Sequence, residues 1–317
     1  MTAPVPRFLF VGGPGRSGTS HVARQLGYHE QITSFPDVEL KILSEKGGLL
    51  DLQHSLVEQY SPNRASVAVQ QFRRMAQAVA TGQYGQPALS TLVDVAVWTA
   101  TVEHFLASLS PSGHPVPLAR TQFANHAQRF LFAIAKLAKA QPSTPSAKTV
   151  FLEKTPHSLL AADFIESLVP SSQYLHVMRD PRAIAYSLRR MRWGPDDLRA
   201  CCAWVASYCD AFRNCVTRPP KKFPHIRQVF IEELVTNPDS TASDLTTWLG
   251  IAPMANMFAS GSSVVLSAWE ASCSGDDHRF LRSQLSDIAV EFGYEADEIG
   301  KRMSLSEAPS CETSVGQ

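Results

Sequence analysis

The chain has 317 residues, enough for one large domain or two of ordinary size. Hydrophobic residues make up 44% of it and charged residues 18%, proportions typical of a globular protein with a sizeable core. The 29 basic and 29 acidic side chains cancel to a formal net charge of zero, which argues against a nucleic-acid partner. An anion-binding site must therefore be a local cluster of Arg and Lys.

Targeting signals and metal-binding patterns are absent from the sequence. Residues 1–7 lack the charged and apolar stretches of a signal peptide, and no apolar run approaches the about 18 residues of a membrane span. The six cysteines form no C-x-x-C pair, and the histidines are scattered, so we expect reduced thiols and no metal site. We expect a cytoplasmic protein without stable membrane insertion; a homodimer is left open.

The first predicted strand, Phe8–Val11, leads into a glycine-rich loop and then a helical stretch. This order builds a cradle of backbone N–H groups at a helix N-terminus, where an anion binds favourably. The spacing Gly13-x-x-x-x-Gly18 is that of nucleotide triphosphatases, but Thr19-Ser20 replaces their Lys-Ser/Thr pair and the cation, Arg16, lies inside the loop. The loop therefore predicts a site for a phosphate-like group rather than for ATP hydrolysis.

The next segment, Pro36–Leu43, alternates polar and apolar residues. If it is extended, Asp37, Glu39 and Lys41 share one face. A carboxylate there is a candidate general base, although a single carboxylate is more often simply solvated.

Residues 49–147 have a different character. Helical periodicity runs through Val67–Ala80, Leu89–Ser108 and Phe123–Lys139, with Pro-rich breaks after the second and third of these. We predict a helical insertion between the first and second core strands, long enough to serve as a lid or a substrate wall. The alternative is a separate helical domain.

Two further predicted strands end in basic residues. After Thr149–Leu152 comes Glu153-Lys154-Thr155-Pro156, in which the proline keeps Thr155 out of a helix and leaves Lys154 at the strand's carboxyl end. After Tyr174–Val177 comes Arg179-Asp180-Pro181-Arg182, in which Asp180 can cap a helix that begins at Pro181. A solvated lysine and a capped helix with a surface arginine are the competing interpretations.

The fourth predicted strand is Gln228–Ile231, and strands that alternate with helices favour a parallel sheet covered by helices on both faces. Ligands bind such sheets at the carboxyl ends of the strands, which is where Arg16, Lys154 and Arg179 lie. Ser187 lies on the second turn of the helix that begins at Pro181, and it could join Arg179 in holding a second phosphate by charge-assisted hydrogen bonds.

Together these segments resemble the sulfotransferases that use 3′-phosphoadenosine 5′-phosphosulfate (PAPS). The matching stretches are Gly15-Arg16-Ser17-Gly18-Thr19-Ser20 for the 5′-phosphosulfate loop, Arg179-Asp180-Pro181-Arg182 with Ser187 for the 3′-phosphate motif, Glu153-Lys154-Thr155-Pro156, and more loosely Glu39-Leu40-Lys41-Ile42-Leu43. Trp193-Gly194-Pro195, residues 230–238 and Ser267-Ala268-Trp269 are similar to stretches of bacterial members.

The resemblance implies one sulfotransferase domain over residues 1–317 with a P-loop-like parallel sheet. Its α/β core would cover 7–48 and 149–300, with the insertion at 49–147 and a disordered tail at 306–317. PAPS would be the sulfuryl donor, no metal would be needed, and the acceptor would be a hydroxyl of a small molecule, glycan or lipid. A P-loop nucleotide kinase and a non-catalytic binder of the product 3′-phosphoadenosine 5′-phosphate (PAP) are the alternatives.

The resemblance also implies roles for individual residues. Arg16, Glu39 and Lys154 would be catalytic, with Glu39 as the base. Ile42-Leu43 replaces the aromatic pair of the family, so Asp37 and then His157 remain alternative bases. The donor would be bound by Gly15, Arg16, Ser17, Gly18, Thr19, Ser20, Arg179 and Ser187.

Overall fold

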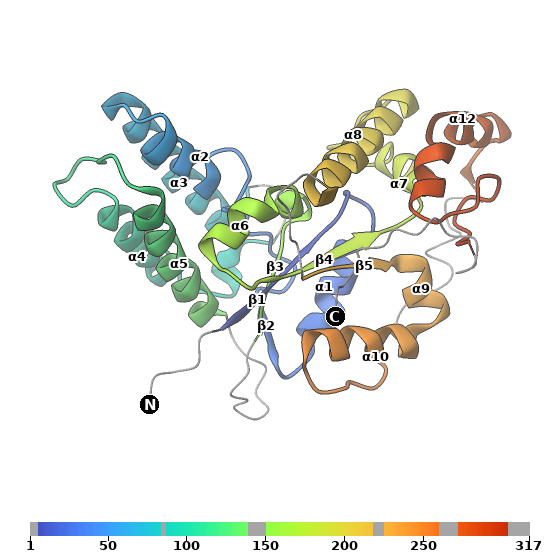
Figure 1. Cartoon of the computed structure of the whole chain (residues 1–317), viewed down its shortest axis with the longest axis horizontal. Coiled ribbons are helices and arrows are strands. Elements are labelled where there is room, and N and C mark those ends of the chain that lie inside the picture. The colour runs from blue at the N-terminus through green and yellow to red at the C-terminus, as the bar shows by residue number, and fades with distance from the viewer. Residues whose placement is uncertain (1–5, 84–86, 139–149, 218–224, 260–271, 304–317) are drawn as a thin grey trace. The chain divides into compact units, whose positions relative to one another are not determined.

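The computed structural model describes residues 6–83, 87–138, 150–217, 225–259 and 272–303. It is an α/β fold with a five-stranded parallel sheet in the order β2-β3-β1-β4-β5, flanked by helices (Figure 1). The strands are β1 (Arg7–Gly12), β2 (Ile32–Ser34), β3 (Val150–Lys154), β4 (Gln173–Met178) and β5 (Ile226–Phe230). The predicted fold class is therefore confirmed.

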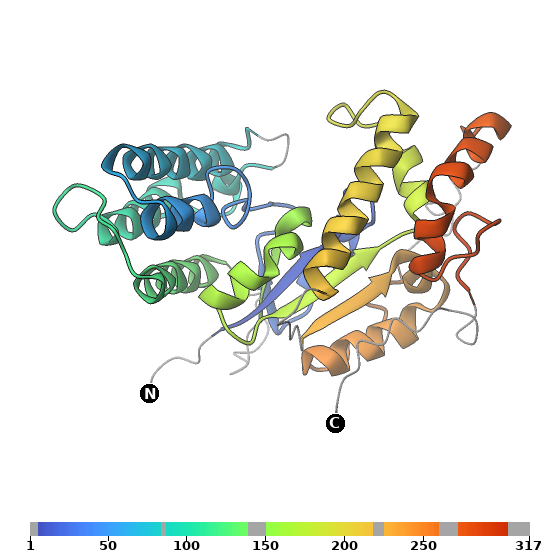
Figure 2. The ribbon, with the colours of Figure 1, turned by 45° about the horizontal axis from the view of Figure 1, so that its top comes forward.

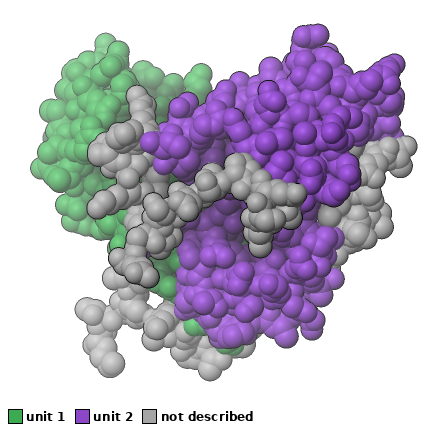
Figure 3. All heavy atoms as spheres, turned by 45° about the vertical axis from the view of Figure 1, so that its right-hand side comes forward, with its two compact units in different colours: residues 1–12, 23–174 green, residues 13–22, 175–317 purple. Residues whose placement is uncertain are grey.

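The chain divides into two compact units (Figure 3). The first contains residues 1–12 and 23–174, and the second contains residues 13–22 and 175–317. The glycine-rich loop thus belongs to the same unit as the segment after β4. The predicted single domain and its internal boundaries remain a prediction.

In the first unit, β3 pairs in parallel with both β1 and β2, and Phe151 lies opposite Phe8 on one side and Thr33 on the other. The central residues of β1 and β3 are apolar and buried, as is typical of a parallel sheet covered on both faces. The three-residue strand β2 was not predicted, since it is too short to show a periodic pattern. The helical insertion consequently follows β2, one strand later than expected.

The three helices predicted in the insertion are present as α3 (Pro62–Thr81), α4 (Val95–Ser108) and α5 (Arg120–Leu137). The insertion also contains α2 (Leu49–Gln53), a π-helix (His54–Glu58) and a 3₁₀ turn (Leu89–Thr91). Phe72, Phe105 and Phe130 form an aromatic core between α3, α4 and α5, with ring centroids 4.5 Å apart for Phe105 and Phe130. The helix expected from Leu89 begins only at Val95, because the Asp94 side chain caps the N–H groups that follow it.

The second unit contains α7 (Pro181–Leu188), α8 (Leu198–Thr217), α9 (Ile231–Thr236), α10 (Pro238–Leu249) and α12 (Gly275–Glu291). Helices α7, α8 and α12 pack together around Ile184, Cys201 and Leu281, and α8 and α12 run side by side in Figures 1 and 2. Cys202 and Cys209 belong to the same core, and burial raises the pKa of each thiol to about 12.

The remaining helices are α1 (Thr19–Gly27), a 3₁₀ helix (Pro156–Ala161) and α6 (Ala162–Leu168). His176 of β4 is fully buried against Phe212, with ring centroids 3.6 Å apart, and burial lowers its pKa to about 3. His176 is therefore part of the core.

Three expectations fall on residues outside the described ranges. They are the stretch Ser267-Ala268-Trp269, the tail 306–317 and the end of the insertion after residue 138. Within the described ranges, no helix has both the length and the apolar character needed to cross a membrane. In the same part of the chain, no three His, Cys, Asp or Glu side chains gather in a metal-binding arrangement.

Candidate functional site

The loop between β1 and α1 has a backbone that only glycine permits at two positions. Gly13 has φ of +156°, and a Cβ there would lie 2.1 Å from the carbonyl oxygen of Val177. Gly18 has φ of +100°, and its Cβ would lie 2.9 Å from Cδ1 of Ile231. The glycine spacing seen in the sequence therefore fixes the path of the loop against its neighbours.

This loop leaves its hydrogen-bond donors unused. Within residues 14–19, the one backbone N–H that reaches a described acceptor is that of Ser17, which donates to the Pro14 carbonyl at 3.1 Å. The Ser17 hydroxyl is fully buried and meets no partner among the described residues. Thr19 is buried and Ser20 exposed. Free N–H groups at the start of a helix and an orphaned buried hydroxyl form a site that can hold an anion.

Arg16 joins this loop to α7. Its φ of +75° is unusual for a residue with a side chain, and the guanidinium Nε donates to the Ser187 hydroxyl at 3.1 Å, across 171 residues of sequence. Gly15, its neighbour, lies against two indoles, because a Cβ there would be 2.9 Å from Trp193 and 3.6 Å from Trp204. Trp193 is 61% exposed despite its size, and no role was assigned to it from the sequence.

The turn after β4 is held by a buried ion pair. The Asp180 side chain caps α7 by accepting from the Arg182 N–H at 2.9 Å, as predicted, and Pro181 occupies the first helical position. The Arg182 guanidinium is fully buried, pairs with Asp180 at 2.8 Å, and donates to the carbonyls of Glu295 and Ala296 at 2.6 Å each. Arg182 therefore ties the turn to the segment after α12.

Arg179 has a different environment. Burial lowers the pKa of its guanidinium, the carboxylate of Glu232 and other acidic groups oppose this, and the positive charge of Arg16 lowers it further. Arg16 and Arg179 are thus close enough to repel each other, and an anion bound beside them would relieve that repulsion. The second unit accordingly brings together the loop, Arg16, Ser187 and Arg179.

Glu232 is a supporting residue that was not given a role from the sequence. Its carboxyl is buried and accepts from the Asp180 N–H at 3.1 Å and from the Tyr294 hydroxyl at 2.8 Å. Burial raises its pKa to about 7. The signal that could have found it is an acidic residue directly after the predicted strand Gln228–Ile231.

In the first unit, Lys154 ends β3 and pairs with Glu39. The lysine is 6% exposed, and its Nζ lies 2.7 Å from Oε1 of Glu39, while Lys41 lies 3.6 Å from the other carboxylate oxygen. Thr155 is extended, as expected of a residue before proline. Glu39 and Lys154, two of the three residues expected to be catalytic, are therefore in direct contact.

The expectation that Asp37 shares a face with Glu39 and Lys41 is wrong. Asp37 and Lys41 both have left-handed backbones, with φ of +60° and +58°, so the alternation of an extended strand does not apply. The Asp37 carboxylate instead pairs with Arg24 at 2.7 Å, on an exposed part of the surface. His157, the other alternative base, lies 3.7 Å from Glu45 and lowers the pKa of that carboxyl through a hydrogen bond.

A second buried carboxyl holds the Glu39 segment in place. Thr155 donates its hydroxyl to Glu153 at 2.6 Å and accepts the Lys41 N–H at 3.2 Å. Burial raises the pKa of Glu153 to about 7, and a hydrogen bond from the Leu40 N–H opposes this rise. Glu153 has no expected role of its own in the motif Glu153-Lys154-Thr155-Pro156, and its position as the acid within an apolar strand is the signal that could have identified it.

The chain is similar to several known proteins. The sulfotransferase domain from the curacin biosynthetic pathway is 16% identical, with a TM-score of 0.47 over 80% of this chain and 77% of that one. A sulfotransferase from Mycobacterium avium is 12% identical, with a TM-score of 0.45 over 95% and 79%. Nodulation protein NoeE of Sinorhizobium fredii is 24% identical over 276 residues, which are 81% of this chain and 53% of that protein, so the chain spans about half of its length. Finally, the model of the sulfotransferase family matches residues 6–255, most of the chain, and this protein therefore belongs to the sulfotransferase family.

Proposed function

We propose that this protein transfers a sulfuryl group from PAPS to a hydroxyl of a small-molecule, glycan or lipid acceptor and releases PAP. The observation that carries the proposal is the hydrogen bond from Arg16 to Ser187. It joins the glycine-rich loop to the helix that follows Arg179, so two basic groups from distant motifs serve one site. A donor with both a 5′-phosphosulfate and a 3′-phosphate matches two such groups.

The residues of the second unit fit this donor. The unused N–H groups of the loop and the orphaned Ser17 hydroxyl suit the 5′-phosphate end, with Gly15, Gly18, Thr19 and Ser20 completing the loop. Arg179 and Ser187 suit the 3′-phosphate, which distinguishes PAPS from ATP. When bound, PAPS supplies an activated sulfuryl group whose leaving group is a phosphate.

In this proposal the chain's own residues stabilise the charge on the leaving phosphate and accept the proton of the acceptor hydroxyl. The acceptor oxygen forms a bond to sulfur as the bond from sulfur to the phosphate oxygen breaks, and Glu39 takes the hydroxyl proton. Arg16 neutralises the charge that develops on the leaving phosphate. Lys154, 2.7 Å from Glu39, holds that carboxylate and supplies a positive charge for the transferred group. Asp37 is the weaker candidate base because its carboxylate pairs with Arg24 on an exposed part of the surface, whereas that of Glu39 lies beside the buried Lys154.

Two alternatives make different predictions. A P-loop kinase needs a divalent cation and the Lys that this loop lacks after Gly18, so a chelator would abolish its activity. A non-catalytic binder would take up PAP without turning over PAPS. The proposed enzyme turns over PAPS in the presence of EDTA.

The decisive experiment is a PAPS turnover assay, with EDTA present, against a panel of hydroxylated acceptors. In Arg16→Ala we expect kcat to fall by at least about a hundredfold, as when one donor to a developing oxyanion is removed. Arg64→Ala, which removes an exposed arginine of α3, is the matched control and should leave kcat unchanged. Near wild-type turnover in Arg16→Ala with an unchanged melting temperature would show that the loop has been assigned wrongly.

A further inference from the structure

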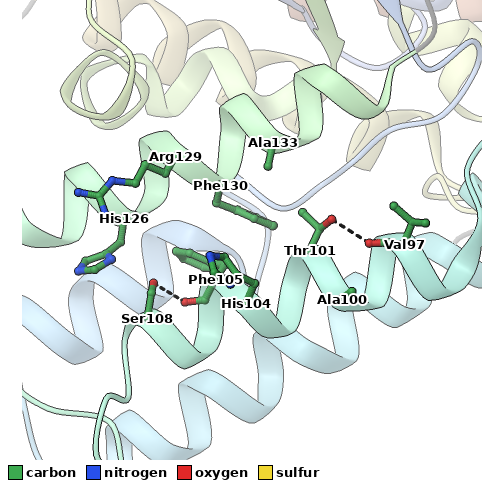
Figure 4. Close-up of a pocket in the computed structure, with 10 residues that line it drawn as sticks. All are labelled: Val97, Ala100, Thr101, His104, Phe105, Ser108, His126, Arg129, Phe130 and Ala133. Atoms are coloured by element: carbon green, nitrogen blue, oxygen red, sulfur yellow. Dashed lines mark hydrogen bonds between the residues drawn. The ribbon is translucent and has the colours of Figure 1, made fainter.

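A groove runs between α4 and α5, within the first unit (Figure 4). Its volume is about 600 Å³, in the range of small-molecule sites. We call it the α4–α5 groove and define it by its lining: Val97, Ala100, Thr101, His104, Phe105, Ser108, His126, Arg129, Phe130 and Ala133. None of the residues assigned to sulfuryl transfer lies in it.

The body of the groove is apolar although it is open to solvent. Phe105 and Phe130 form its stacked floor, and Val97 is 47% exposed at its rim. Two hydroxyls in the lining are turned back onto their own helix: Thr101 donates to the Val97 carbonyl at 2.8 Å and Ser108 to the Phe105 carbonyl at 2.6 Å. Both hydroxyls therefore already donate a hydrogen bond within the protein, and the surface that the groove offers to a ligand is mainly apolar.

The polar character of the groove is concentrated at one end. Figure 4 shows His126 and Arg129 at one end and Val97 and Ala100 at the other, with His104 on the facing helix. His126 and Arg129 are three residues apart on α5, so they lie on one face of the helix. Burial and the charge of Arg129 lower the pKa of His126. These three side chains are the groove's hydrogen-bond donors to a ligand.

Electrostatics selects the sign of that ligand. The lining contains no Asp or Glu, and none of His104, His126 and Arg129 forms an ion pair or hydrogen bond with another described residue. The acidic residue of α4, Glu103, is occupied by Arg73 at 2.6 Å. The groove thus combines an apolar body with an uncompensated positive charge at one end.

We propose that the α4–α5 groove binds a small amphiphile made of an apolar body and a single anionic head, with a medium-chain carboxylate as the simplest case. The apolar part lies over Phe105 and Phe130, and the head is bound by Arg129 with His104 and His126. The proposal does not depend on PAPS chemistry, since it concerns residues and a ligand that the sulfuryl transfer does not use.

The test uses the full chain and two probes. The fluorescence of 8-anilinonaphthalene-1-sulfonate, an anionic aromatic amphiphile, reports occupancy, and decanoate competes for the site. We expect decanoate to displace the probe and decylammonium, with the same chain and the opposite charge, to displace it at least about tenfold more weakly. Equal displacement by the two would overturn the proposal.

Two variants with matched controls locate the binding. Ala100→Trp fills the groove and should abolish displaceable binding, whereas Ala96→Trp, exposed on α4 outside the groove, should not. Arg129→Gln should weaken the affinity for decanoate about tenfold. Arg74→Gln, which replaces an exposed arginine of α3, should leave that affinity unchanged. Circular dichroism verifies folding of each variant.

A second copy of the chain is the competing occupant of this face. If sedimentation shows a wild-type dimer that Ala100→Trp converts to a monomer, the groove is a subunit interface and the proposal is wrong. Wild-type affinity for decanoate in both Ala100→Trp and Arg129→Gln would equally overturn it.

Discussion

The turns after β3 and β4 each contain one buried charged residue that holds the turn in place, but the charge is negative after β3 and positive after β4. At the end of β3, the buried structural residue is the carboxyl of Glu153, and the neighbouring Lys154 pairs with Glu39. At the end of β4, the buried structural residue is the guanidinium of Arg182, and the neighbouring Arg179 is a second arginine, whose pKa is lowered by burial. In each motif, one charged residue builds the turn and another is available for chemistry.

The difference between them lies in how fully each buried charge is satisfied. Arg182 has a carboxylate and several carbonyl partners, so its charge is compensated within the protein. Glu153 accepts a hydroxyl and meets no partner at Oε2 among the described residues, and burial raises its pKa to about 7. The β4 turn is thus a fixed ion pair, whereas the β3 turn contains a group that can change its charge near neutral pH.

The largest expected effect concerns Glu39, on the β3 side. Glu39→Gln keeps the size of the side chain and removes its basicity, so kcat should fall roughly a hundredfold to ten-thousandfold with little change in PAP affinity. Steady-state turnover with PAPS and calorimetric titration with PAP measure the two quantities. Asp37→Asn is the control and should lower kcat only slightly. A large loss of kcat in Asp37→Asn with a small one in Glu39→Gln would make Asp37 the base.

The next effect separates Arg182 from Arg179. Arg182→Ala leaves Asp180 buried without its ion-pair partner and should lower the free energy of unfolding by about 3–5 kcal/mol. Arg179→Ala should change it far less, because the pKa of Arg179 is lowered by burial in the wild type and the residue is destabilised there. Urea unfolding of both variants decides the matter, and equal losses would show that Arg179 is also structural.

A smaller effect defines what Arg179 binds. Loss of a charge-assisted hydrogen bond should weaken PAP about tenfold to a hundredfold in Arg179→Ala. Adenosine 5′-phosphosulfate has no 3′-phosphate, so its affinity should change little. Calorimetric titration of both nucleotides distinguishes the cases, since an equal loss for the two would place Arg179 away from the 3′-phosphate.

The smallest effect is the pH dependence at the end of β3. A buried acid whose pKa rises from 4.5 to about 7 keeps its proton in the folded state after the unfolded chain has lost it. The folded state then binds more protons, so its stability falls as pH rises through this range. Between pH 5.5 and 6.5, wild type should lose about 1 kcal/mol relative to Glu153→Gln.

Urea unfolding at the two pH values measures this difference. Glu30→Gln, which removes an exposed carboxylate, is the matched control and should follow the wild-type pH dependence. If the Glu153→Gln curve also parallels the wild-type curve, the Glu153 carboxyl does not titrate in this range.

Elements with local signals could be predicted from the sequence. Apolar runs located four strands, of which β1, β3 and β4 are buried along most of their length. The cap formed by Asp180 and Pro181 located the start of α7. The glycine spacing predicted the loop because Gly13 and Gly18 adopt backbones that other residues rarely do. The three-residue strand β2 was not predicted because it is held in place by pairing with β3, which is a long-range contact.

Which charged residues pair with one another depends on the folded chain. The local pattern does not show which partner each charged residue has, because those partners lie about a hundred residues away, such as the Glu295 carbonyl for Arg182 and Lys154 for Glu39. The left-handed backbone at Asp37 and Lys41 likewise overrode an alternation that favoured a strand. Burial and pairing arise from packing, and packing is a property of the whole fold.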